Sequence, residues 1–238
     1  MPPAGALHCV INAAAVYNLL DMAGNKISRI LSLLQQAYGR RVWQPGRGPV
    51  EVLVQTILSQ NTSDTNSQRA YDNLLADFAD WDAVAEADPG RVAFAIKSGG
   101  LGAVKAGYII QALRQIKSLR GGFDLSFLRD MTMEQARQWL TALPGVGMKT
   151  ASCVLLFALG MPSLPVDTHV FRVAGRLGLL PAKASADQAH LLLEKVVPAG
   201  DVYPFHILLI EHGRKTCKSQ RPLCAASVSY THLTLPTN

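Results

Sequence analysis

The chain has 238 residues, 49% of them hydrophobic and 17% charged, which is the balance of a globular protein that buries a core without disulfides. Its formal net charge of +6 favours a polyanionic partner such as nucleic acid, although basic domains without such a partner are common. Four cysteines are too few for a disulfide framework, no apolar run reaches the roughly 18 residues of a membrane span, and no basic leader precedes the first apolar residues. The composition therefore predicts a cytoplasmic protein that contacts no membrane.

The N-terminal segment lacks a helical pattern. Residues 1–21 are mostly apolar, but Asn12, Asn18 and Asp21 interrupt any hydrophobic face. Helical spacing of apolar residues starts only beyond Met22. We therefore expect residues 1–21 to be an extension or a mis-assigned start, and the first helix to follow Met22.

Apolar residues at helical spacing predict helices over most of the remaining chain. The Pro- and Gly-rich loop 44–49 precedes a helix over 50–60, and Asp64 is placed to cap the next helix. Further helices are predicted after Asp88-Pro89, over 105–119, from Thr132 to Leu143, up to Leu159, from Asp167 through Gly175, and over 185–197 and 203–215. No alternating run of β-branched residues predicts a strand, so the expected fold class is all-α.

A glycine-rich turn joins two of these helices within the segment 140–151. Its centre is Pro144-Gly145-Val146-Gly147. Glycine lacks a Cβ and accepts positive φ, so a phosphate can come close to the backbone there. The unpaired amides at the start of the following helix favour an anion. The segment therefore predicts a hairpin that grips a phosphate, although a simple packing corner between helices would use the same glycines.

The hairpin and three other segments together resemble the helix–hairpin–helix DNA glycosylase superfamily, and in particular its endonuclease III family. The segment 57–64 resembles the one that supplies a gap-filling glutamine, and Gly102 with Lys105-Ala106 matches a further family loop. Val166-Asp167-Thr168-His169-Val170 resembles the family's aspartate segment. These matches follow the family's order from about Lys26 to Cys224.

This resemblance implies a two-lobed all-α fold with a DNA groove between the lobes. A six-helix barrel containing the helix–hairpin–helix is expected over residues 44–161. The second lobe, a cluster-loop domain, is expected to combine an N-terminal helix from residues 1–43 with residues 162–238.

By the same resemblance, Lys149 and Asp167 are the catalytic residues. An amine that attacks the sugar C1′ forms a Schiff base, which allows strand cleavage by β-elimination. An ordinary lysine, with a pKa of about 10.4, holds its free amine roughly 4–5 kcal/mol uphill at pH 7, and burial at a helix N-terminus lowers that barrier. Asp167 is suited to cap a helix and to stabilise oxocarbenium charge on the sugar. A surface lysine near phosphate and a purely structural cap are the alternatives.

Contacts to DNA are expected from a larger group of residues, some through the backbone. Gln60 resembles the residue that fills the gap left by an extruded base. His169 has the pattern of a packing histidine more than that of a proton shuttle. The expected DNA-binding residues are Gln60, Gly145, Val146, Gly147, Lys105, Thr150, His169 and Arg172.

The C-terminal segment departs from the family pattern. The family usually ends in four cysteines, spaced Cys-x6-Cys-x2-Cys-x5-Cys, that hold a 4Fe–4S cluster. Cys217 and Cys224 supply two metal ligands at the right spacing, but Ser227 and Leu233 stand at the other two places. We expect the full-length family member to carry the cluster and this chain, truncated and with artefactual residues from about 227 to 238, to lack it. A natural member without a cluster is the alternative.

The predicted function is a base excision repair DNA glycosylase with abasic-site lyase activity, acting on oxidised pyrimidines. Glycosylases for mismatched uracil or thymine, or for oxidised guanine, are close alternatives. A non-catalytic helix–hairpin–helix module that binds DNA and a helical scaffold with no DNA role are the alternatives of other classes. The expected partner is double-stranded DNA with a damaged base or an abasic site, bound by a monomer associated with a bacterial or archaeal nucleoid.

Overall fold

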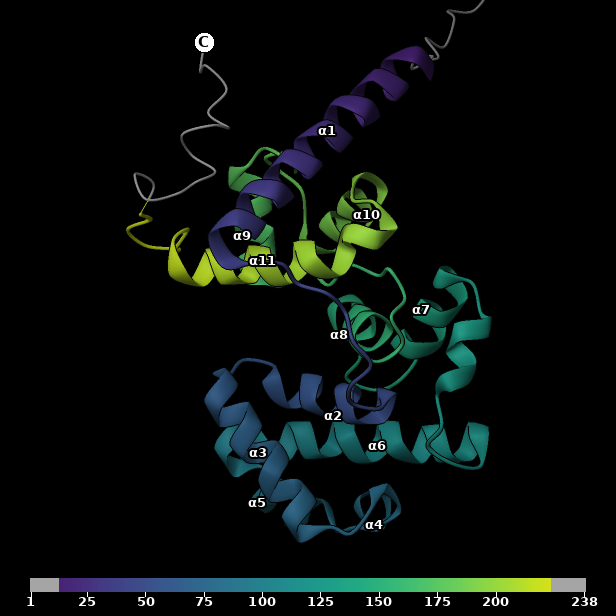
Figure 1. Cartoon of the computed structure of the whole chain (residues 1–238). Coiled ribbons are helices and arrows are strands. Elements are labelled where there is room, and N and C mark those ends of the chain that lie inside the picture. The colour runs from purple at the N-terminus through teal and green to yellow at the C-terminus, as the bar shows by residue number, and fades with distance from the viewer. Residues whose placement is uncertain (1–12, 224–238) are drawn as a thin grey trace, which may run out of the picture.

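The computed structural model describes the backbone of residues 13–223 and the side chains of residues 25–223. Within this range all regular structure is helical (Figure 1), which confirms the all-α prediction. No helix in it is long and apolar enough to cross a bilayer. The helices are α1 (Ala13–Tyr38), α2 (Pro49–Ser59), α3 (Asp64–Asp77), α4 (Trp81–Glu86), α5 (Pro89–Ala95), α6 (Gly102–Arg120), α7 (Met133–Thr141), α8 (Met148–Cys153), α9 (Thr168–Arg176), α10 (Ala186–Val196) and α11 (Val202–Lys215).

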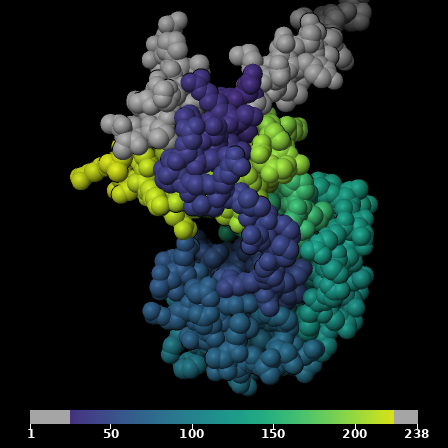
Figure 2. Space-filling view, viewed as in Figure 1, coloured from purple at the N-terminus to yellow at the C-terminus, as the bar shows by residue number. Residues whose placement is uncertain are grey.

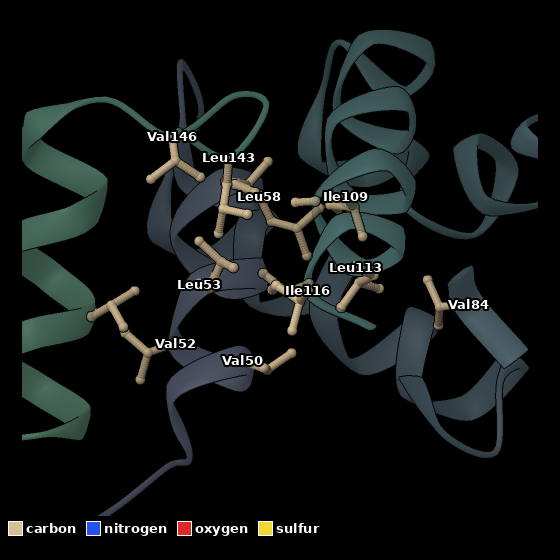
Figure 3. Close-up of a cluster of buried hydrophobic side chains, with 14 of the residues drawn as sticks. Val50, Val52, Leu53, Leu58, Val84, Ile109, Leu113, Ile116, Leu143 and Val146 are labelled. Carbon is tan, nitrogen blue, oxygen red and sulfur yellow. The ribbon is translucent and has the colours of Figure 1, made fainter. Parts of the chain in front are cut away.

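The first hydrophobic core lies among helices α2 to α8. Leu53 and Leu58 of α2 face Ile109 and Leu113 of α6 (Figure 3), and each of these four side chains is fully buried. Burying one such side chain stabilises the fold by about 1.5–3 kcal/mol. The apolar residues of the hairpin before α8, including Leu143, close one end of this core.

The second hydrophobic core joins the two ends of the described chain. Ile27, Ile30 and Leu34 of α1 pack with Phe205 and other apolar residues of α11, and helices α9 and α10 complete the cluster. Figure 1 shows α1 lying beside α9, α10 and α11, apart from α2 to α6. The residues of the two cores fall mostly within the residue ranges expected for the two lobes. The boundaries of the lobes stay a prediction.

Two predicted helix starts were wrong. Helix α1 begins at Ala13 rather than after Met22, so residues 13–21 are helical although their sequence shows no continuous apolar face. Residues 1–12 lie outside the described range, and a non-native origin for the N-terminal segment stays a prediction. Helix α3 is capped by Ser63, whose hydroxyl accepts a hydrogen bond from the Asn66 amide at 3.3 Å. Asp64 is therefore the first residue of α3 and not its cap.

Local sequence signals fix most of the other helix ends. Asp88 caps α5 by accepting hydrogen bonds from two backbone amides, and Thr132 forms a capping box with Gln135 at the start of α7. The short helix α4 escaped prediction because its six residues do not cover two full turns, although Asp80 caps it. After α8 the chain continues as one π-helical segment, Val154–Ala158, which places Phe157 between the two cores.

Two connecting segments, residues 39–48 and 159–167, and one buried ion pair join the two cores. In the first segment, the indole Nε1 of Trp43 donates a hydrogen bond to the Phe157 carbonyl at 3.1 Å. The ion pair links Arg137 of α7 to Glu194 of α10 at 2.6 Å, with Ser163 of the second segment hydrogen-bonded to the same carboxylate. The side chains of Arg137 and Glu194 are 6% and 15% exposed, so a largely buried ion pair links α7 to α10.

Candidate functional site

A cleft opens between the two cores and is bordered by residues from both. Figure 2 shows the surface hollowed between the part of the chain around residues 50–80 and the C-terminal helix α11. The cleft holds two adjoining pockets of about 560 and 640 Å³. Five residues line both pockets: Ser59, Asp64, Lys149, Asp167 and Arg214. We name the first the His206 pocket and the second the Gln60 pocket, after a residue that lines each one alone.

Lys149 is the second residue of α8 and reaches the cleft from the first lobe. Its side chain is half-buried and borders both pockets. No residue in the described part of the chain hydrogen-bonds or ion-pairs with its ammonium group. The amine is therefore available to a molecule bound in the cleft.

Asp167 lies across the cleft, at the start of α9. Its Oδ1 accepts a hydrogen bond from the Val170 amide at 2.7 Å, which is the predicted cap. The residue is half-buried and borders both pockets, like Lys149. Capping thus holds the carboxylate in place without removing it from the cleft, so the structural and catalytic interpretations are compatible.

The hairpin has the geometry that its glycines predicted. Gly145 has φ +75°, and a Cβ on it would lie 2.5 Å from the Tyr108 ring, so no other residue fits there. The Gln60 amide donates to the Gly145 carbonyl at 3.1 Å and ties the end of α2 to the hairpin. Gly147 is extended, and nothing lies within 4 Å of a Cβ built on it. Its backbone is therefore open to an approaching anion.

Burial limits how three of the expected DNA contacts can act. The side chains of Val146 and Thr150 are buried, so these residues can offer a ligand only their backbone groups. Lys105 is only 2% exposed, and its ammonium donates to the carbonyls of Leu58 and Gly99 at 2.8 and 2.7 Å. Lys105 therefore ties α6 to the end of α2 and is not placed to contact phosphate.

Arg172 and His169 form one interaction at the C-terminal end of α11. The Arg172 guanidinium donates to the carbonyls of Cys217 and Gly213 at 3.0 and 2.9 Å, and to His169 Nδ1 at 3.1 Å. Arginine only donates, so His169 Nδ1 is the acceptor. These contacts support the packing role for His169, which also borders the Gln60 pocket, and show Arg172 committed to the protein's own carbonyls.

Two cleft residues lie outside the expected set of catalytic and DNA-binding residues, namely Arg214 and Asn61. Arg214 of α11 forms an ion pair with Asp64 at 2.7 Å, linking the two sides of the cleft. Asn61 borders the Gln60 pocket, is exposed and has φ +51°. Leu101, which lines neither pocket, is also exposed and has φ +53°. For Leu101 the surrounding Gly99-Gly100-Leu101-Gly102 could have indicated an apolar residue at the tip of a turn.

His206 is the least predictable member of the cleft. It lies in α11, is 2% exposed and still borders the pocket that holds Lys149 and Asp167. Its Nδ1 lies 2.8 Å from the Pro165 carbonyl. Burial lowers the pKa of His206 to about 4, so the imidazole is neutral at pH 7. No pattern around residue 206 distinguishes this histidine from an ordinary core residue.

In the part of the chain that the structure describes, Cys217 is the one cysteine of the expected cluster segment. The Cys217 sulfur accepts a hydrogen bond from Arg176 at 3.3 Å, whereas Cys224, Ser227 and Leu233 lie outside the described residues. In the described range no three His, Cys, Asp or Glu side chains gather as metal ligands. The sequence supplies only two cysteines in this segment, so the residues do not fit the cluster that the resemblance implies.

Comparison with known proteins agrees with the resemblance carried by the hairpin and the aspartate segment. Residues 54–199 match the model of the HhH-GPD superfamily of base excision DNA repair proteins. The chain belongs to this superfamily. It is a DNA glycosylase homologue, 36% identical over 180 residues to endonuclease III of Escherichia coli, with 76% of this chain and 81% of the relative covered. Endonuclease III of Sulfolobus acidocaldarius is 35% identical over 180 residues, covering 75% of this chain and 78% of the relative.

Other relatives extend the family assignment. A candidate DNA glycosylase of Arabidopsis thaliana is 39% identical over 168 residues, which span 70% of this chain but 57% of the plant protein. Among solved structures, a non-covalent endonuclease III–DNA complex has a TM-score of 0.75 at 27% identity, covering 88% of this chain and 94% of that one. A thermostable thymine-DNA glycosylase, with a TM-score of 0.67 at 22% identity, shows the same fold. The predicted fold is thus confirmed.

Proposed function

We propose that this HhH-GPD protein is a DNA glycosylase with abasic-site lyase activity that removes oxidised pyrimidines. The observation that carries the proposal is the position of Lys149 and Asp167, which approach one cleft from different lobes and border the same two pockets. An unpartnered amine and a carboxylate on opposite sides of a cleft are the two groups that the reaction needs.

The reaction follows from these two groups. An extruded nucleotide enters the His206 pocket at an unstacking cost of a few kcal/mol. The neutral Lys149 amine attacks the sugar C1′, and the bond from C1′ to the base breaks with the electron pair leaving on the base, which takes up a proton. Asp167 stabilises the positive charge that develops on the sugar. The C1′–O4′ bond then breaks, O4′ takes up a proton, and the opened sugar is left as a Schiff base on the lysine nitrogen. Removal of a C2′ proton expels the 3′ phosphate by β-elimination.

Residues at the rim of the cleft would contact the DNA backbone and fill the gap that the extruded base leaves in the stack. The amides around Gly147 can grip one phosphate because the helix start leaves them unpaired. Gln60 is the predicted gap-filling residue. Its side-chain amide donates a hydrogen bond to the Gly145 carbonyl of the hairpin. The next residue, Asn61, is exposed. No step of this mechanism involves a metal cluster, and we propose that this chain works without one held by four cysteines.

Borohydride trapping on duplex DNA with a single abasic site tests the proposal. The parent protein is expected to form a covalent adduct, and Lys149→Gln is expected to form none while keeping its circular dichroism spectrum. Lys183→Gln is the matched control, because Lys183 is exposed and borders neither pocket. A folded parent that forms no adduct would contradict the lyase proposal and favour a non-catalytic DNA-binding module.

A further inference from the structure

The His206 pocket has one polar wall whose hydrogen-bond directions are fixed. Arg47 donates to the Gln55 amide oxygen, the Gln55 nitrogen donates to the Gln68 oxygen at 2.9 Å, and the Gln68 nitrogen donates to Asp72 at 2.7 Å. Arginine can only donate and an ionised aspartate can only accept, so neither glutamine amide can be reversed without losing a bond. Gln55 and Gln68 line the pocket, and each nitrogen keeps a second N–H to offer there.

The opposite wall contributes a hydrogen-bond acceptor. The Pro165 carbonyl can only accept, so His206 Nδ1 carries the proton of the neutral ring. Nε2 therefore holds a lone pair. No residue in the described range hydrogen-bonds to Nε2. A buried atom of this kind would be unsatisfied, and Nε2 is not one of the buried unsatisfied atoms, so it keeps some exposure. Because His206 lines the pocket, we take Nε2 to face it. Phe157, in edge-on contact with the ring at 5.5 Å, restricts its movement.

The His206 Nε2 acceptor, facing the amide donors of Gln55 and Gln68, matches a base edge that has one donor beside an acceptor. A pyrimidine derived from thymine or uracil presents the ring N3–H between two carbonyl oxygens. An extruded base is read through hydrogen bonds to this edge. A cytosine-type base presents a bare N3, whose lone pair would face that of Nε2.

We propose that His206 determines base specificity by accepting the N3–H of a lactam-type pyrimidine, while Gln55 and Gln68 donate to a neighbouring carbonyl. The inference rests on the proposed glycosylase function. It predicts that thymine- and uracil-derived lesions are excised faster than cytosine-derived ones. A buried acceptor that meets another acceptor leaves both unsatisfied, which corresponds to a rate ratio of about tenfold or more.

His190 provides a matched control. It is buried like His206, its Nδ1 lies 2.8 Å from the carbonyl of Leu164, next to Pro165, and burial lowers its pKa too. It borders neither pocket of the cleft. A substitution that harms the protein only by removing a buried imidazole should therefore act equally at both histidines.

Two substitutions separate the two ring nitrogens. In His206→Asn, the amide can keep the hydrogen bond to Pro165 but does not reach the position of Nε2. In His206→Gln, the amide oxygen can reach the position of Nε2 but loses the Pro165 contact. A structural role predicts that Asn is the better replacement, whereas a recognition role predicts that Gln is.

The experiment measures excision of 5,6-dihydrouracil and of 5-hydroxycytosine from otherwise identical duplexes, together with trapping on an abasic site. We expect His206→Asn to lower the ratio of dihydrouracil to hydroxycytosine excision by about tenfold or more, and His206→Gln to restore most of it. His190→Asn should leave the ratio unchanged. An unchanged ratio in His206→Asn, or equal losses in the Asn and Gln variants, would overturn the inference.

Two further outcomes keep this inference distinct from the proposed function. A parent protein that traps abasic sites but excises hydroxycytosine faster than dihydrouracil overturns the role of His206 and leaves the lyase proposal standing. A parent that traps no abasic site contradicts the lyase proposal itself. If His206→Asn does not fold, N3-methyl-5,6-dihydrouracil in the parent protein removes the same hydrogen bond from the substrate side, and excision as fast as for dihydrouracil would again overturn the inference.

Discussion

The two hydrophobic cores differ in the polar groups that they bury beside the apolar ones. The first core has one buried amine, Lys105, which is tied to two carbonyls. Three buried imidazoles accompany the second core, those of His190, His206 and His212, and burial lowers the pKa of each one. The first core therefore serves as a rigid support for the hairpin and Lys149, whereas the second buries neutral imidazoles, of which that of His206 borders the cleft. The difference predicts that the two lobes respond to different perturbations.

The hairpin supported by the first core should be the most sensitive to a small change of shape. Gly145→Ala places a Cβ against the Tyr108 ring at a positive φ, and we expect it to lower the free energy of unfolding by about 3–4 kcal/mol. Urea denaturation measures the effect. Gly147→Ala, which meets no atom within 4 Å, is the control and should change it by under about 1 kcal/mol. Equal losses at the two glycines would show that the hairpin is not under this steric constraint.

Acid should act mainly on the second core. The unfolded chain protonates histidine near pH 6.5, whereas folded His206 stays neutral down to about pH 4. The unfolded state thus binds more protons between these values, so the free energy of unfolding falls as the pH drops through this window, by about 3 kcal/mol from His206. Thermal melts at several pH values should show a shallower slope for His206→Asn than for the parent. Identical slopes would contradict the buried neutral imidazole.

Lys105 tests whether the buried amine of the first core is structural. Lys105→Met leaves the carbonyls of Leu58 and Gly99 without their donor, and we expect a loss of stability of about 2 kcal/mol. Because burial also lowers the pKa of Lys105, part of this loss is offset by removing a desolvated charge. The salt dependence of binding to duplex DNA should stay unchanged at a temperature where the variant is folded. A smaller dependence of binding on salt in Lys105→Met would show that Lys105 contacts a phosphate in the bound state and would contradict the structural role.

The ion pair across the cleft should have the smallest effect on stability. Asp64 and Arg214 are largely exposed, so Asp64→Asn should cost under about 1 kcal/mol. It also removes a negative charge from the mouth of both pockets and frees the arginine for phosphate. We therefore expect binding to duplex DNA at low salt to tighten by roughly threefold, measured by fluorescence anisotropy. Weaker binding would show that Asp64 supports the bound state.

Local chemistry explains what the sequence could predict. Caps such as Asp88, the glycines of the hairpin and the apolar spacing of α2 and α6 act over a few residues, and the structure has them as expected. Lys149 and Asp167 were predicted because each stands in a distinctive local segment, and both border the cleft. The start of α1, the burial of Lys105 and the position of His206 depend on contacts between segments far apart in the chain. No local pattern encodes such contacts, so a lysine or histidine of this kind is misassigned or missed.

The central claim is that the amine of Lys149 becomes covalently bound to the sugar. Peptide mapping by mass spectrometry of the borohydride-trapped complex, after nuclease digestion, locates the modified residue directly. We predict a deoxyribose-derived mass on the peptide that contains Lys149 and a missed tryptic cleavage at that lysine. A remnant on another lysine, or on the N-terminal amine, would contradict the assignment even if trapping itself succeeds.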